Sequence, residues 1–115
     1  MKTVVFDFDG VIHSYKSGFK GVEVIPDPVV SGIREAIAEI RAAGYKVVVV
    51  STRCREESGI AAIKEYLKNN DIVVDDIAHT KPPAVVYIDD RAICFDGDTK
   101  GLLSKIKAFK PWYYK

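Results

Sequence analysis

One stretch, residues 4–12, constrains the fold of this chain more than any other part of the sequence. The apolar run over residues 3–8 predicts a strand that is covered on both faces, as in a parallel sheet. Asp7 and Asp9 come at its far end, and Gly10 follows at once. Strand side chains alternate between faces, so these two carboxylates would point the same way if the strand continued through both. We expect the strand to end near Phe8 instead, with Gly10 beginning the turn. Open parallel sheets build their sites at the carboxyl ends of strands, and paired carboxylates there suit Mg²⁺.

The rest of the sequence alternates between apolar runs of strand length and segments with helical spacing of apolar residues. This alternation predicts an α/β fold, namely a Rossmann-like three-layer α/β/α sandwich with a central, mainly parallel sheet. Asp27-Pro28 has the pattern of a helix N-cap followed by proline, and Gly44 has that of a helix end. The other expected elements are strands over residues 47–50, 72–78, 84–88 and 92–95, and helices over residues 56–69 and 102–109.

Length and composition predict one globular domain over residues 1–115, with residues 10–27 as a small hairpin or flap. The net charge of +1 provides no bulk attraction to nucleic acid or to a membrane. No apolar run approaches the roughly 20 residues of a membrane helix, and the N-terminus does not have the pattern of a signal peptide. Cys54 and Cys94 have no metal-type spacing, so we expect reduced thiols and a cytoplasmic protein.

Polar residues follow three of the expected strands at the points where those strands end. The carboxyl ends of parallel strands meet at one edge of a sheet, so these side chains should lie close together. Such repeated placement favours a functional metal site over ordinary turn residues. The residues are Asp7 and Asp9, Ser51 and Thr52, and Asp89 and Asp90.

The order of these motifs resembles the haloacid dehalogenase-like (HAD) phosphohydrolase superfamily, and the resemblance covers essentially the whole chain. Each motif alone is weak, but their order is specific. The motifs are Asp7-Phe8-Asp9-Gly10-Val11-Ile12, Val47 to Val50 followed by Ser51, Lys81 within Thr80-Lys81-Pro82-Pro83, and Tyr87-Ile88-Asp89-Asp90.

The resemblance implies a Mg²⁺-dependent phosphomonoester hydrolase that works through an aspartyl-phosphate. Asp7 would be the nucleophile, and Asp9 would be general acid and then general base. The implied metal ligands are the Asp7 carboxylate, the Asp9 backbone carbonyl and Asp90. Asp89 would bind the ion directly or through water. The ion would offset the repulsion between an anionic nucleophile and an anionic phosphate.

The implied phosphate contacts come from the second and third motifs. Ser51 and Thr52 would hydrogen-bond phosphate oxygens, and Lys81 would neutralise the phosphate. Lys81 departs from the family pattern, because the helix that usually separates this lysine from the next strand is missing. If Lys81 lies at the wrong end of that strand, Arg53, Lys16 or Lys20 would replace it. Arg53 could also grip a leaving group.

The short flap region makes the chain resemble a capless member of the superfamily. An open site implies a bulky substrate, such as a polynucleotide 3′-phosphate or a phosphoprotein, or closure by a second subunit. Nucleic acid is expected only as a substrate, and no membrane partner is expected.

Two other classes of function stay open. A phosphoacceptor signalling module uses similar residues, but there the acidic pair leaves the first strand and the acceptor aspartate a middle strand. A binding protein that kept the fold without catalysis is the second alternative.

Overall fold

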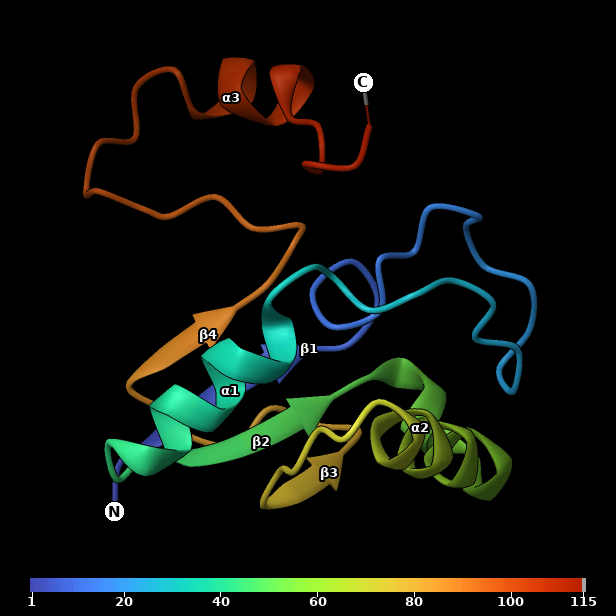
Figure 1. The fold of residues 1–115 in the computed structure, drawn as a ribbon. Coiled ribbons are helices and arrows are strands. Elements are labelled where there is room, and N and C mark those ends of the chain that lie inside the picture. Colours follow the sequence, from blue (N-terminus) through green and yellow to red (C-terminus); the bar gives the residue numbers. More distant parts are fainter. Residues whose placement is uncertain (115) are drawn as a thin grey trace.

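Four parallel strands form the centre of the molecule, in the order β3-β2-β1-β4 (Figure 1). The structure is a computed structural model and describes residues 1–114. The strands are β1 (Thr3–Asp7), β2 (Lys46–Val50), β3 (Asp76–Ala78) and β4 (Val86–Ile88). The helices are α1 (Ile33–Ala42), the 3₁₀ turn η1 (Thr52–Arg55), α2 (Glu57–Asn69) and α3 (Leu102–Ala108).

The register of β1 brings the ends of the strands together. Asp7 pairs with Val50 of β2, and Phe6 pairs with Ile88 of β4. The residues that follow Val50 and Ile88 therefore leave the sheet beside Asp7. The parallel α/β sheet that the sequence predicts is confirmed, and the register explains how residues far apart in the chain share one edge.

Helices α1 and α2 both cover the same face of the sheet. The apolar core on that face joins Val4 and Phe6 of β1 to Ile37 of α1 and Ile63 of α2. Right-handed crossovers from β1 to β2 and from β2 to β3 run in one direction across the sheet, so both helices must fall on one side. The start and end of α2 agree with the predicted helix over residues 56–69 within one residue.

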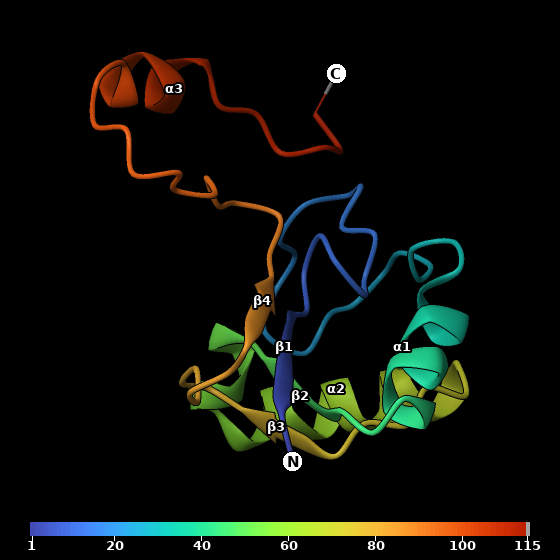
Figure 2. The same cartoon turned by 90° about the vertical axis from the view of Figure 1, so that its left-hand side faces the viewer.

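The opposite face carries Val5, Val48 and Val50, against which Ala78 and Ala84 pack. The connection from β3 to β4 is residues 79–85, and it crosses between the two edges of the sheet without a helix. Helix α3 has no buried residue and stands beyond the strand ends, as Figures 1 and 2 show. In residues 1–114, the helical cover of the expected three-layer sandwich is therefore formed on one face.

Two local predictions are wrong. Residues 92–95 form no strand. The first helix begins after Gly32 rather than after Asp27. The Asp27 carboxylate instead accepts hydrogen bonds from the backbone N–H and hydroxyl of Ser17, at 2.8 and 2.6 Å. Asp27 thus closes the loop after β1. Of the two forms expected for this loop, hairpin or flap, the structure has a flap built from turns.

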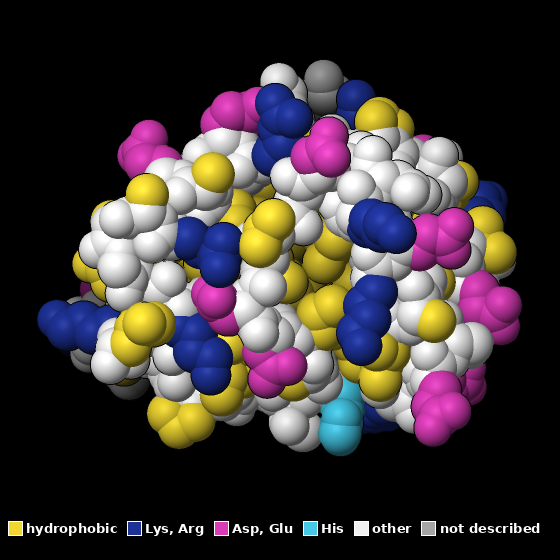
Figure 3. Space-filling view, turned by 60° about the horizontal axis from the view of Figure 1, so that its bottom comes forward, with side chains coloured by type: hydrophobic (Ala, Val, Ile, Leu, Met, Phe, Trp, Pro, Cys, Tyr) yellow, Lys and Arg dark blue, Asp and Glu magenta, His cyan; other side chains and the backbone are white. Residues whose placement is uncertain are grey.

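The surface at the opposite end of the molecule from α3 mixes charges of both signs. Figure 3 shows Lys and Arg interspersed with Asp and Glu there, around a hollow in which hydrophobic side chains are visible. This face carries no continuous basic stripe, in keeping with the net charge of +1. None of the helices within residues 1–114 has the length and hydrophobicity needed to cross a membrane.

Candidate active site

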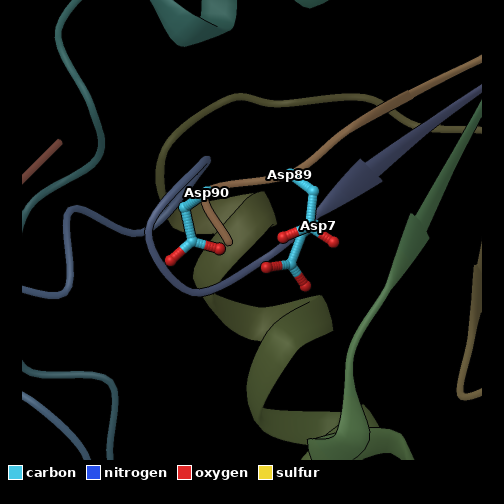
Figure 4. Close-up of side chains that lie close together, drawn as sticks. All are labelled: Asp7, Asp89 and Asp90. Carbon is cyan, nitrogen blue, oxygen red and sulfur yellow. The ribbon is translucent and has the colours of Figure 1, made fainter. Parts of the chain in front are cut away.

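Three carboxylates converge at the carboxyl ends of β1 and β4. One oxygen each of Asp7, Asp89 and Asp90 lies within 4.8 Å of the others. Figure 4 shows the side chains turned toward one another, Asp7 from β1 and the other two from the chain that leaves β4. This is the convergence that the strand-end pattern predicts, and it follows from the pairing of β4 beside β1.

The electrostatics of this cluster are unfavourable for three free carboxylates. Burial raises the pKa of Asp7 to about 8, helped by a hydrogen bond to Asp90 and by the charges of Asp89 and Asp90. Like charges held together disfavour ionisation unless a cation joins them. A divalent cation with a preference for oxygen ligands would reverse this penalty.

The hydrogen bonding of Asp90 is a second observation that indicates a cation site. Its Oδ2 atom accepts a hydrogen bond from the Tyr113 hydroxyl at 2.6 Å. Its Oδ1 atom is buried and has no hydrogen-bond partner within the described chain. A buried polar atom without a partner costs free energy and calls for an explanation, and a bound ion is one. The donor set and the orphaned oxygen together fit a divalent cation.

Lys81 reaches this cluster despite the missing helix. Its Nζ atom lies 3.0 Å from Oδ2 of Asp89. Burial by itself raises the pKa of Asp89, but the Arg91 backbone N–H and the Lys81 ammonium outweigh it, and the pKa is lowered. Lys81 therefore lies at the edge of the sheet where the sequence places the third motif, within reach of a ligand at Asp7 and Asp89.

Asp9 lies outside the three-carboxylate cluster and has its own partners. Arg53 Nε is 2.9 Å from Oδ2, and His13 Nδ1 is 2.9 Å from Oδ1. Burial by itself raises the pKa of Asp9, but these hydrogen bonds and the charge of Arg53 outweigh it, so the pKa is lowered. Asp7 and Asp9 thus have pKa values pushed in opposite directions, a pattern typical of paired groups with different chemical roles.

Ser51 and Arg53 are both buried at the end of β2. The Ser51 hydroxyl accepts a hydrogen bond from the Arg53 backbone N–H at 3.1 Å and so caps η1. A hydroxyl can also donate, so Ser51 retains a donor for a phosphate oxygen. Thr52 is exposed beside it. The Arg53 guanidinium is engaged by Asp9 and by carbonyl oxygens of the flap.

Sequence reasoning missed the roles of His13 and of the C-terminal aromatic residues. His13 is fully buried, with Asp9 at one ring nitrogen and the Asp27 backbone N–H at the other. Trp112 Nε1 donates a hydrogen bond to the Gly10 carbonyl oxygen at 2.6 Å. The spacing of His13 four residues after Asp9 was visible in the sequence. No local sequence pattern indicated which residues Trp112 and Tyr113 would contact.

No family model matches the chain, and no curated protein matches it. A similar solved structure is D,D-heptose 1,7-bisphosphate phosphatase from B. bronchiseptica complexed with magnesium and phosphate. It has a TM-score of 0.52 and 24% identity, over 83% of this chain and 56% of that chain. The chain therefore shares its fold with this phosphatase. A second similar structure, D,D-heptose 1,7-bisphosphate phosphatase from Burkholderia thailandensis, has a TM-score of 0.41 and 23% identity, over 68% of this chain.

The chain spans about half the length of these solved structures, 52% and 56% of the respective chains. The predicted HAD-like resemblance is confirmed at the level of the fold. In this fold, Asp7 leaves β1 between the ends of β2 and β4. The chemical roles of the site residues stay predictions.

Proposed function

We propose that this protein is a Mg²⁺-dependent phosphomonoester hydrolase of the HAD type, with an aspartyl-phosphate intermediate on Asp7. The convergence of Asp7, Asp89 and Asp90 at one edge of a HAD-type sheet carries this proposal. The similar B. bronchiseptica phosphatase is complexed with magnesium and phosphate, which supports the choice of ion and substrate class.

Asp7, Asp89, Asp90 and the Asp9 backbone carbonyl would hold the ion. When bound, Mg²⁺ would supply positive charge that stabilises the ionised Asp7 and the charge on the transferring phosphoryl group. The unpartnered Oδ1 of Asp90 would be one of its ligands. Tyr113 would hold the other oxygen of Asp90 and so fix the orientation of this carboxylate.

Asp7 would attack the phosphorus atom of a phosphomonoester, forming an oxygen–phosphorus bond as the bond to the leaving oxygen breaks. That oxygen would depart as an anion and take a proton from water. Water would then hydrolyse the aspartyl-phosphate, with Asp9 accepting a proton from that water. The lowered pKa of Asp9 keeps it ionised at neutral pH, the form that accepts a proton. In the free protein, Asp9 is thus already in the form that the hydrolysis of the aspartyl-phosphate requires. Substrates whose leaving oxygen needs little protonation would react most readily in the first step.

The phosphate oxygens would be bound by the Ser51 hydroxyl, by Thr52 and by Lys81. Lys81 is anchored at Asp89, 3.0 Å away, so its charge lies at the edge of the cluster. Arg53 was a candidate phosphate ligand by sequence. Its buried guanidinium binds Asp9 and flap carbonyl groups, so we assign it to positioning Asp9 instead.

Phosphate release from p-nitrophenyl phosphate, glucose 6-phosphate and a 3′-phosphorylated oligonucleotide tests this function, with MgCl₂ or with EDTA. Wild-type protein should release phosphate only with MgCl₂. Asp7→Asn should be inactive, and Asp9→Asn should lose about 10²-fold to 10⁴-fold in kcat. Asp96→Asn, at an exposed residue in the segment before α3, is the matched control and should keep full activity.

The same variants separate an enzyme from a phosphoacceptor module or a binding protein. Intact-mass measurement should show a phosphoryl group that accumulates on Asp9→Asn and turns over on wild type. A phosphoryl group that persists equally on both would indicate a signalling module. Absence of phosphate release from every substrate, with Mg²⁺ binding retained, would contradict the enzyme proposal.

A further inference from the structure

The C-terminal tail returns to the proposed active site. Trp112 Nε1 donates to the Gly10 carbonyl oxygen, and the Tyr113 hydroxyl donates to Asp90 Oδ2, both at 2.6 Å. Figures 1 and 2 show this segment, in red, running back from α3 toward the loop after β1, in blue. Two hydrogen bonds to the first and fourth motifs thus fix residues 112–113 beside the three carboxylates.

A pocket of about 200 Å³ lies between this tail and the flap. The Tyr113 ring meets Tyr15 at 5.9 Å between centroids and 84° between planes, and Tyr114 at 5.2 Å and 71°. Because these rings contact one another edge to face rather than in a parallel stack, the tyrosines do not cover all of each other's ring faces. A planar ligand could stack on a face that is left open. The lining residues are Tyr15, Lys16, Ser17, Gly18, Tyr113 and Tyr114.

Tyr15 occupies a strained backbone position to present its ring there. Its φ of 61° lies in the left-handed region, which is unfavourable for a residue with a side chain. The pKa of Tyr15 is raised, first by burial and then by the charge of Asp9. The Tyr15 ring lies 5.8 Å, centroid to centroid, from the ring of His13, which is hydrogen-bonded to Asp9, and Tyr113 joins the same pocket to Asp90.

The chemistry of the walls narrows the class of ligand. Aromatic cages often bind cations, but Lys16 in this wall would repel one. The Ser17 hydroxyl already donates to Asp27 at 2.6 Å, so few polar groups remain for a sugar with several hydroxyls. The pocket is smaller than the roughly 300–1,000 Å³ of sites for drug-sized ligands, so it fits a single ring system. A flat heteroaromatic ring with acceptor atoms satisfies all three conditions.

We propose that the pocket formed by Tyr15, Tyr113 and Tyr114 is the leaving-group subsite of the phosphatase and binds the base of a nucleotide. The inference rests on the proposed function for the position of the phosphate at Asp7. Stacking of the base on the tyrosine rings would then select nucleotides from other phosphomonoesters, with Lys16 facing acceptor atoms of the base.

Binding is tested first, without turnover. Adenosine 5′-monophosphate, adenosine 3′-monophosphate and glucose 6-phosphate are titrated into Asp7→Asn protein while backbone amide NMR signals are recorded. The two nucleotides should shift the signals of residues 15–18 and 113–114, and glucose 6-phosphate should not. Equal shifts with glucose 6-phosphate, or no shifts with either nucleotide, would overturn the inference even if phosphatase activity is found.

Selectivity is tested next, with the ratio of kcat/KM for the better nucleotide to kcat/KM for glucose 6-phosphate. Tyr114 is exposed, and Tyr114→Ala should lower this ratio roughly 5-fold to 150-fold, the loss of one stacked base. Tyr45→Ala, at the opposite end of β2, is the matched control and should leave the ratio unchanged. An unchanged ratio in Tyr114→Ala would overturn the inference.

The experiments give different results if the proposed phosphatase function is wrong and if the base-binding pocket is wrong. Nucleotide-induced shifts in the pocket, without hydrolysis of any phosphomonoester by wild type, would retain the base-binding pocket and remove the enzyme. Hydrolysis of all three compounds at equal kcat/KM would retain the enzyme and remove the subsite.

Discussion

The guanidinium group of Arg53 binds the carboxylate of Asp9 through two nitrogens, with Nε 2.9 Å from Oδ2 and Nη2 3.2 Å from Oδ1. Nη1 of the same group donates to the carbonyl oxygens of Gly21 at 2.7 Å and Val22 at 2.8 Å. One buried side chain thus joins the end of β2 to the first motif and to the flap. These contacts of Arg53 set the orientation of the Asp9 carboxylate and the position of the flap.

Replacing Arg53 with lysine should destabilise the protein by about 1–3 kcal/mol, because an ammonium group cannot reproduce the forked contacts and leaves partly buried acceptors unpaired. Urea denaturation measures this loss, and hydrogen exchange should show faster exchange of flap amides. The control is Arg34→Lys, at an exposed arginine paired with Glu35, which should change stability by less than about 0.5 kcal/mol. An equal loss of stability in Arg53→Lys and Arg34→Lys would contradict the proposal that Arg53 connects β2, the first motif and the flap.

Mg²⁺ should raise the melting temperature of wild-type protein. An ion that binds only the folded state adds about 2.7 kcal/mol at a hundredfold excess over its dissociation constant. Asp90→Asn should abolish this gain, and without metal it should be at least as stable as wild type, because one like charge is removed from the cluster. Calorimetry with and without MgCl₂ measures both. Asp98→Asn in the exposed segment before α3 should respond to MgCl₂ as wild type does.

Gly10→Ala should disrupt the site sterically. Gly10 has φ of 83°, and an added methyl group would collide with the Asp90 carboxylate and the Tyr113 ring. Gly32→Ala is the matched control, because Gly32 has φ of 82° and open space around it. The backbone strain of roughly 1–2 kcal/mol is common to both variants, so thermal unfolding should show a larger loss at Gly10. Gly10→Ala should also lose the Mg²⁺-induced stabilisation, whereas Gly32→Ala should retain it.

Acid should destabilise the flap through Asp27. Hydrogen bonds from the Ser17 hydroxyl and backbone N–H lower the pKa of Asp27 in the folded protein. Its stabilising contribution is therefore present above the unfolded pKa of about 3.9 and is lost as pH falls through the lower folded value. Asp27→Asn should be less stable than wild type at pH 7 and should lose less stability between about pH 5 and pH 2.

Denaturation midpoints across this pH range give the comparison for Asp27. Asp71→Asn, at a highly exposed aspartate, should retain the acid dependence of wild type. An identical pH profile for Asp27→Asn and wild type would remove Asp27 as the cause.

The sequence by itself determined the sheet and the edge where the candidate site lies. The buried runs around Val4 and Val47 specify strands, and the alternation with helices makes their pairing parallel. Once the strands are parallel, Asp7 and Asp90 must leave the same edge. Local periodicity suffices for this result, because it encodes which face of each element is buried.

Only the tertiary structure decided which partners the polar groups take. Asp27 looks like a helix cap in the sequence, but its carboxylate closes the flap onto Ser17. Trp112 meets Gly10 from a distance of 102 residues along the chain. A hydrogen bond or an ion pair depends on where packed elements bring two side chains, and no local pattern records that geometry. The strands are therefore readable from the sequence, whereas the contacts of Arg53 and of the aromatic tail follow from the packing of the whole chain.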